Sequence, residues 1–166
     1  MILVHRKIDI NADRAYVLER HCRVNYACDT PWKRVMPYEA YRAEWFGLRG
    51  QTEGFMNALA ESCAHPGTLA EILLTQGGEV VGYLWAPFCA DDESGFKFAE
   101  IQDIYIEERF RQSGIAAELF VYAEDNARAH GARVIRSGTG CENAASMGLH
   151  SKMGYYRYRF EYEKEL

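Results

Sequence analysis

Hydrophobic and polar positions change their spacing several times along the chain, and each spacing predicts an element. Glycines and a proline separate the segments of the first 63 residues. Asn11 or Asp13 offers a side-chain oxygen that caps the first helix. Pro31 restricts Thr30 and lacks a backbone donor, so CDTPW predicts a loop. The expected elements are a strand over residues 2–8, a helix through Tyr16, Val17 and Leu18, a loop over 28–32, and short helices over 38–46 and 52–63.

The pattern changes its period after residue 68. Residues 69–75 and 80–88 are apolar β-formers on either side of a Gly-Gly turn, which predicts a β-hairpin. Residues 96–106 alternate like a strand, and apolar positions in 114–130 recur at helical spacing. The later expected elements are a turn over 90–95, a strand over 96–106, a helix over 114–130, a strand over 133–138, a helix over 143–153 and a closing strand over 155–166. This order predicts an α/β or α+β sandwich around one central sheet.

The composition fits one globular domain. The chain has 166 residues, 48% hydrophobic and 26% charged, which is enough for a sizeable core. No apolar run reaches the roughly 18 residues of a membrane span. The apolar start is too short for the core of a signal peptide, so we expect a cytoplasmic protein without a membrane partner.

Charge and cysteine usage narrow the partners. The net charge is −5 and no basic stripe stands out, so we expect no nucleic-acid partner. The five cysteines are irregularly spaced and predict reduced thiols. The pairs His21–Cys22 and Cys63–His65 have no second pair at a zinc spacing, so we expect no metal.

The stretch RFRQSGIAAELF (109–120) is the first candidate for chemistry. Its charged loop passes through Gly114 directly into a helix, whose first N–H groups lack partners and lie at the positive end of the helix dipole. A pyrophosphate suits such a position. Gly114 lets the backbone approach it, Ala116 is small, and Arg111 adds charge. An ordinary helix N-terminus explains the same residues, so this motif alone leaves both interpretations open.

Two longer motifs resemble the GNAT superfamily of acyl-CoA-dependent N-acyltransferases. In that family a strand ends Asp-apolar-aromatic-apolar before Arg/Gln-x-x-Gly-x-Gly/Ala, and residues 103–106 and 111–116 keep this pattern. Residues 143–155 keep the spacing of the later motif Asn-x-x-small-x-x-Leu-Tyr-x-x-x-Gly-Phe. His150 stands where the family has Tyr, and Tyr155 where it has Phe.

The resemblance implies a fold and an activity. The fold is a single domain over residues 1–166, α/β (α+β), with a mixed central sheet flanked by helices in the order β-α-α-β-β-β-α-β-α-β. The activity is transfer of an acetyl group from acetyl-CoA to a primary amine of a small molecule or peptide, by direct attack in a ternary complex. A homodimer is a further expectation by analogy.

The resemblance also implies which residues hold acetyl-CoA. Strand backbone groups bond the pantetheine arm as an added strand would, and an N–H near Ile106 stabilises the developing oxyanion. Asn143 bonds the arm from the other side, although an N-cap role explains it equally. The implied contacts are Ile104, Ile106, Arg111, Gln112, Ser113, Gly114, Ile115, Ala116, Asn143 and Ser146.

The chemistry needs a base for the amine and an acid for the thiolate. Glu100 and Asp103 are the candidate bases, directly or through water. In an ideal strand Glu100 and Gln102 share one face and Asp103 lies on the other, unless a bulge changes that parity. His150 is the candidate proton donor, because an imidazolium can protonate a thiolate.

The acceptor side is less specific. Tyr26, Asp29 and Trp32 offer an aromatic wall and one carboxylate for a cationic or amphipathic amine, although core packing and a solvated loop explain them too. An amino acid, a polyamine, an aminoglycoside-like molecule and a protein N-terminus all stay open. Two alternatives are a catalytically degenerate acyl-CoA-binding or sensing domain, and a nucleotide-binding module, which lacks the Lys-[Ser/Thr] of a P-loop.

Overall fold

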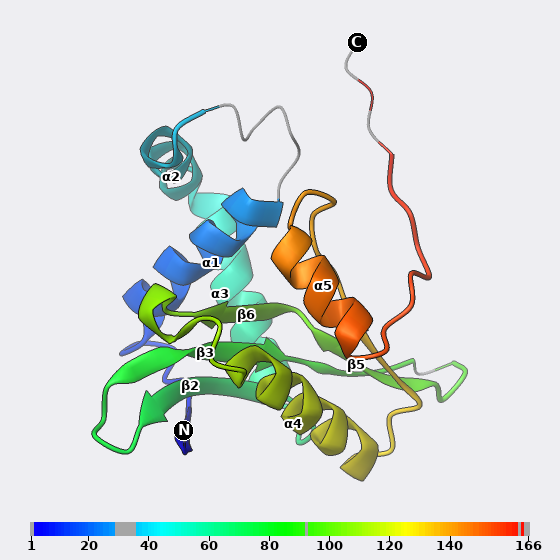
Figure 1. Ribbon diagram of the computed structural model, residues 1–166. Helices are drawn as coiled ribbons and strands as arrows, with labels where there is room; N and C mark the ends of the chain where they lie inside the picture. Colours follow the sequence, from blue (N-terminus) through cyan, green and yellow to red (C-terminus); the bar gives the residue numbers. More distant parts are fainter. Residues whose placement is uncertain (1, 29–35, 92, 163, 165–166) are drawn as a thin grey trace.

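A computed structural model of the chain describes residues 2–28, 36–91, 93–162 and 164 (Figure 1). The elements follow the expected order closely, apart from the C-terminal strand. They are β1 (Leu3–Lys7), α1 (Arg14–Cys28), α2 (Tyr38–Gly47), α3 (Arg49–Cys63), β2 (Leu69–Thr75), β3 (Val80–Ala86), β4 (Phe88–Ala90), β5 (Lys97–Ile101), β6 (Asp103–Ile106), the 3-10 turn η2 (Glu108–Phe110), α4 (Ile115–Ala129), β7 (Val134–Ser137) and α5 (Ala144–Lys152).

The strands form two sheets that meet at one residue. Four antiparallel strands follow the order β1-β2-β3-β6, and a second sheet follows β4-β5-β7. Within the second sheet β5 and β7 run parallel, as a crossover through α4 requires. Only Gln102 separates β5 from β6 along the chain. The mixed α+β architecture is therefore confirmed, with the expected single sheet divided in two at Gln102.

A β-bulge at this junction reverses which residues share a face. The Gln102 N–H donates to the Trp85 carbonyl at 3.0 Å, and Asp103 also pairs with Trp85, so two residues oppose one. Before the bulge Ile101 packs in the core that holds α4, whereas after it Tyr105 packs in the core that holds α1. The bulge thus brings Asp103 to the side of Glu100, and the parity of an ideal strand does not apply.

Two cores cover opposite faces of the four-stranded sheet. The larger core joins α1, α2 and α3 to side chains such as Tyr83 and Trp85 of β3. The other joins α4 to Leu84 and Ala86 of the same strand, because successive strand residues point to opposite faces. Figure 1 shows α1 and α3 on one side of the sheet and α4 on the other.

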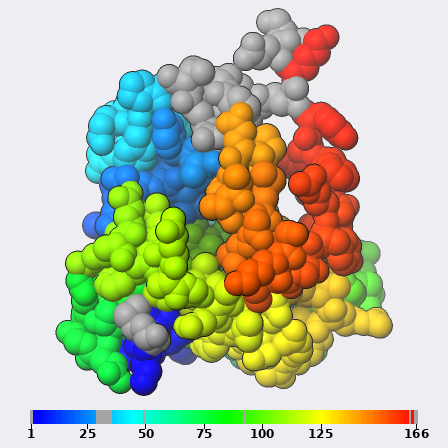
Figure 2. Space-filling view, viewed as in Figure 1, coloured from blue at the N-terminus to red at the C-terminus, as the bar shows by residue number. Residues whose placement is uncertain are grey.

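The expected C-terminal strand is wrong for residues 155–162, which form no strand. Their aromatic alternation has no buried face: Tyr156 is 80% exposed and Tyr162 is 92% exposed, and Tyr158 and Phe160 are exposed as well. Figure 2 shows this segment, in red, standing away from α5. Alternation indicates a strand only when one face is covered, and here only Tyr155, at the start, packs on the core.

Candidate active site

The outer edge of β6 is open. Among the described residues β6 is the last strand of its sheet and β7 pairs with β5 alone, so β6 and β7 separate after Ile101 and Ser137. The Glu107 N–H donates to the Val81 carbonyl at 2.9 Å. Because an antiparallel ladder alternates, the amides of Ile104 and Ile106 point away from β3, toward the opening. An extended ligand arm can add to this edge as another strand would.

The loop after β6 leads to a helix N-terminus without a side-chain cap. Gly114 precedes α4 with φ 90°, a left-handed conformation that glycine adopts without strain. The Ser113 hydroxyl donates to the Phe110 carbonyl at 2.5 Å, so it does not cap the helix. Arg111 Nε donates to the Ile106 carbonyl at 2.9 Å, which ties the loop to β6. The first amides of α4 therefore face an anion site that no side chain of the helix closes.

The remaining residues predicted to contact acetyl-CoA differ in which of their atoms a ligand can reach. The Ile115 side chain is buried, so only its backbone is available to a ligand. Ala116 is half-buried in the same first turn. The Asn143 side chain accepts from the Ser146 N–H at 3.1 Å, so its capping role is confirmed. The Asn143 amide nitrogen is still a donor for a ligand.

The connection between β7 and α5 touches the end of α1. A Cβ at Gly140 would lie 2.8 Å from the Cys28 carbonyl oxygen, so only glycine fits against this backbone. Cys28 Sγ lies 3.9 Å from Thr139 Oγ1 in the same contact. The end of α1 is therefore packed directly on the segment that leads to Asn143.

His150 lies in the last turn of α5 with one ring nitrogen engaged. Nδ1 donates to the Ser146 carbonyl at 2.7 Å, and Nε2 is buried without a partner among the described residues. The rings of Phe120 and Tyr155 meet it edge-on, with centroids at 5.2 and 5.4 Å. Because Nδ1 carries the proton of the neutral ring, Nε2 can donate a proton only from the imidazolium.

Asp103 is held in a buried polar cluster. His21 Nδ1 donates to Asp103 Oδ2 at 2.6 Å, and the Tyr83 hydroxyl donates to the same oxygen. The other oxygen, Oδ1, is buried without a partner in the described part of the chain. Burial, with the nearby carboxylate of Asp103, raises the pKa of Tyr83 well above its ordinary value, so Tyr83 stays a neutral donor. The second nitrogen of His21, Nε2, lies 3.0 Å from the Asn25 amide nitrogen.

Aromatic side chains fix the position of His21. Its ring stacks on Phe55 with centroids at 3.8 Å and meets Trp45 edge-on at 5.7 Å. The sequence analysis considered His21 only beside Cys22, as a metal ligand. Its partner Asp103 lies 82 residues away along the chain, and only the packing of α1 on β6 joins them.

The other predicted catalytic and acceptor residues lie apart from this cluster. Glu100 pairs in register with Arg136 of β7, whose guanidinium lies over the Phe98 ring at 4.2 Å. The Tyr26 hydroxyl donates to the Met36 carbonyl at 2.9 Å. Asp29 and Trp32 lie outside the described residues.

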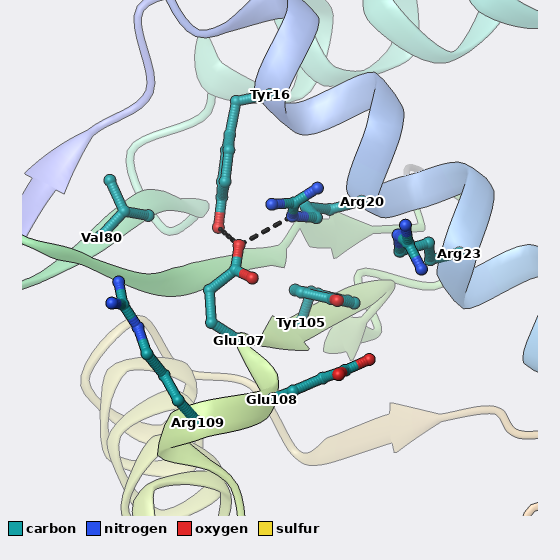
Figure 3. A pocket seen from close by; sticks show the side chains of 8 residues that line it. All are labelled: Tyr16, Arg20, Arg23, Val80, Tyr105, Glu107, Glu108 and Arg109. Atoms are coloured by element: carbon teal, nitrogen blue, oxygen red, sulfur yellow. Dashed lines mark hydrogen bonds and ion pairs between the residues drawn. The ribbon is translucent and has the colours of Figure 1, made fainter.

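A pocket of about 630 Å³ opens between α1 and the end of β6 (Figure 3). Its floor is Tyr105, two residues after Asp103 and on the same strand face. Arg20 Nε and the Tyr16 hydroxyl both donate to Glu107 Oε1, at 2.7 and 2.9 Å. The lining residues are Tyr16, Arg20, Arg23, Val80, Tyr105, Glu107, Glu108 and Arg109. None of these side chains was among the site residues predicted from the sequence.

None of the described helices is long and apolar enough to cross a membrane. No three His, Cys, Asp or Glu side chains in that part of the chain gather in a way that would hold a metal ion.

Residues 34–155 match the model of the acetyltransferase (GNAT) family. The chain belongs to the GNAT acetyltransferase family. Within the family it is similar to an L-methionine sulfoximine/L-methionine sulfone acetyltransferase of Pseudomonas paraeruginosa, with 28% identity over 128 residues. These residues are 75% of this chain, and they span 63% of the length of that relative.

Solved GNAT structures share the fold. An aminoglycoside 6'-N-acetyltransferase from Acinetobacter baumannii superposes with a TM-score of 0.64 at 16% identity, covering 99% of both chains. An aminoglycoside N-acetyltransferase in complex with CoA gives a TM-score of 0.61 at 17% identity, covering 99% of this chain and 95% of that one. At these identities the likeness establishes the fold.

Proposed function

We propose that this protein transfers an acetyl group from acetyl-CoA to the primary amine of a small molecule or peptide. The open edge of β6 beside the uncapped start of α4 carries the proposal, because it offers outward amides and an anion site on neighbouring segments. Family membership supports the acetyl transfer, and the Pseudomonas relative, named for amino-acid acceptors, supports a small-molecule amine.

The acyl donor would lie along β6. The amides of Ile104 and Ile106 would bond the pantetheine arm, and the one nearest the thioester would stabilise the developing oxyanion. The pyrophosphate would bind at residues 111–116, on the first amides of α4. Asn143 and Ser146 would contact the arm from the start of α5.

The amine would lose its proton to His21 Nε2, in place of the Asn25 amide that donates to this nitrogen at 3.0 Å, with Asp103 as the positioning residue. An attacking amine must be neutral, and histidine readily exchanges a proton near neutral pH. Asp103 would stabilise the imidazolium through Nδ1, while its free Oδ1 would accept from the incoming ammonium or a water. A buried carboxylate oxygen without a donor costs free energy, and such a ligand relieves that cost. Glu100 stays a second candidate base.

The leaving thiolate would take its proton from His150. Its Nε2 is the free nitrogen, and the aromatic packing holds the ring in one orientation. In His150→Phe, which keeps a ring there, kcat should fall while KM for acetyl-CoA changes little. An unchanged kcat at saturating substrates would remove this role.

A thiol-release assay tests the proposed function. Purified protein is mixed with acetyl-CoA and a panel of amino acids, polyamines, aminoglycosides and short peptides. Thiol release that depends on one amine class supports the enzyme. If acetyl-CoA raises the melting temperature but no amine in the panel releases thiol, the acyl-CoA-binding or sensing alternative is favoured. If acetyl-CoA neither raises the melting temperature nor releases thiol, the proposed acetyl-CoA site along β6 is wrong.

A further inference from the structure

The charges that line the pocket between α1 and β6 are unevenly neutralised. Glu107 is paired with Arg20 at 2.7 Å, and Arg109 is paired with Glu79, outside the pocket. Glu108 lies at the rim, with a side chain that is 76% exposed and 4.0 Å from Arg111. Of the pocket's three arginines, Arg23 is the one without a close carboxylate in the part of the chain that the structure describes.

Arg23 competes poorly for its nearest carboxylate among the described residues. That carboxylate belongs to Glu19, at 3.9 Å. Both Glu19 oxygens have closer partners: Arg42 Nε at 2.7 Å and the Tyr38 hydroxyl at 3.1 Å. The Arg23 guanidinium lies over the Tyr38 ring, at 4.5 Å, and none of its donors has a close partner among the described residues.

Arg20 adds further donors from the same side of α1. Arg20 and Arg23 are three residues apart and therefore neighbours on the helix surface. Arg20 bonds Glu107 through Nε, while its guanidinium lies over the Tyr16 and Tyr105 rings, at 4.9 and 5.5 Å. Figure 3 shows Arg20 and Arg23 projecting from α1 above Tyr105. Rigid guanidinium groups of this kind match the two oxygens of a carboxylate.

We infer that this pocket binds the carboxylate of an amino-acid acceptor, with Arg23 as its main partner and Arg20 as its second. The inference rests on the proposed function and names its acceptor class. Tyr105, the pocket floor, lies between Ile104 and Ile106, whose amides would hold the acyl donor. A carboxylate held above Tyr105 therefore keeps the α-amine of the same molecule near the thioester.

The pocket chemistry separates amino acids from polycationic acceptors. An aminoglycoside or polyamine would place several ammonium groups beside Arg20 and Arg23, and such like charges repel. Of the two pocket carboxylates it could meet, Glu107 is already bonded by Arg20 and Tyr16, and Glu108 is exposed to screening by water and salt. A zwitterionic amino acid meets the arginines with the opposite charge.

The test compares two amines that differ by one carboxylate. L-Methionine sulfone and its decarboxylated analogue, 3-(methylsulfonyl)propylamine, are assayed for thiol release with the wild type, Arg23→Gln and Glu108→Gln. Arg128→Gln is the matched control, because this arginine lies on the exposed side of α4 and pairs only with residues of that helix in the described part of the chain.

The wild type should acetylate the sulfone about tenfold to hundredfold more efficiently than the analogue, the usual range for charge-assisted hydrogen bonds. Arg23→Gln should remove most of this preference through a higher KM for the sulfone, whereas the analogue, which has no carboxylate to lose a partner for, should not be used less efficiently than by the wild type. Arg128→Gln should behave as wild type, and KM for acetyl-CoA should stay within about twofold throughout.

Three results would overturn the inference while leaving the proposed function intact. They are equal use of the two amines, a larger loss in Glu108→Gln than in Arg23→Gln, and a rise in KM for acetyl-CoA in Arg23→Gln. The last would assign Arg23 to a phosphate of the cosubstrate. If no amine is acetylated, the proposed function fails. Calorimetry with L-methionine sulfone and CoA-bound protein then tests whether the pocket binds an amino acid. Binding to the wild type that is lost in Arg23→Gln supports the inferred carboxylate site. Absence of binding to the wild type contradicts it.

Discussion

The Asp103 carboxylate is the central acceptor of the buried polar cluster. One oxygen takes both His21 and Tyr83, and the other takes no described residue. The side chain is 0% exposed, so neither oxygen has bulk water as a partner. Such a group is stable only while its donors stay in place, which makes His21 and Asp103 a pair that acts together.

We predict that His21→Gln lowers kcat by about 10²-fold to 10⁴-fold, because glutamine can donate to Asp103 but cannot take a proton near neutral pH. The rate of the variant should rise with pH as more free amine becomes available, whereas the wild type should level off. Rates measured against pH, with circular dichroism as the folding check, test this. A variant with the wild-type pH profile would leave His21 a purely structural role.

The pair between Arg6 and Asp13 gives a pH-dependent stability. Both terminal nitrogens of Arg6 donate to Asp13, each at 2.8 Å, and this pairing holds the pKa of Asp13 below its ordinary value. The folded pKa is the lower one, so the stabilisation is present above the ordinary pKa and is lost as pH falls through the folded value.

Asp13→Asn should therefore lower the free energy of unfolding by about 1 kcal/mol at neutral pH, and by progressively less as pH falls below about 4. Urea unfolding across this range measures the difference. Asp125→Asn, at an exposed pair on α4, is the control and should stay within about 0.5 kcal/mol at every pH. If Asp13→Asn lowers the free energy of unfolding by the same amount at every pH, the ion pair with Arg6 is not the cause of the loss.

Among the elements, the contact of β3 with β6 is the least tolerant of change. A Cβ at Gly82 would collide with the Tyr105 carbonyl, which belongs to backbone and cannot turn aside. By contrast Gly54, within α3, has nothing within 4 Å of its Cβ position. The two glycines therefore respond in opposite directions to the same added methyl group.

Gly82→Ala should destabilise the protein by about 1–3 kcal/mol through strain in the ladder. Gly54→Ala should stabilise it by about 0.5–1 kcal/mol, because alanine is the better helix former. Urea unfolding of both variants gives the comparison. Equal and small changes in the free energy of unfolding would mean that β3 and β6 can move apart, and would contradict the close contact of Gly82 with the Tyr105 carbonyl.

Most elements followed from local pattern. The hairpin over 69–88 and the helix over 114–130 were predictable because one apolar face, or one turn, decided each of them. The bulge at Gln102 was not, because a single extra residue leaves the polar and apolar sequence of 96–106 unchanged. The same holds for the proposed site: the proposed pyrophosphate loop, residues 111–116, is a contiguous motif, whereas the pairing of His21 with Asp103 depends on the bulge.

For the whole molecule, the C-terminal segment adds surface without adding core. Its alternating aromatic residues predicted a strand, but alternation does not show whether a partner covers either face. A protein lacking residues 157–166 should melt within about 2 °C of the full chain, because the removed aromatic side chains are exposed. Removal of Tyr155 as well should lower the melting temperature further, since that ring packs on Phe120.

Thermal unfolding at several protein concentrations tests this prediction. A large loss of stability in the shorter protein, present only at high concentration, would mean that the aromatic segment is buried between two copies of the chain. The expected homodimer would then rest on this segment. A loss that is the same at all concentrations would mean that the segment stabilises its own chain.

We predict that the contact of Gly140 with Cys28 couples the binding of the two proposed substrates. α1 carries the proposed acceptor residues His21 and Arg23, and the segment that touches the end of α1 leads to Asn143, a proposed contact of acetyl-CoA. Binding of acetyl-CoA at Asn143 should therefore also order α1. Such coupling is reciprocal: acetyl-CoA should tighten the acceptor by the same factor by which the acceptor tightens acetyl-CoA. Dissociation constants measured with and without the second ligand, using an unreactive CoA thioether, give both factors. In Gly140→Ala, whose Cβ would press on the Cys28 backbone, both should approach one.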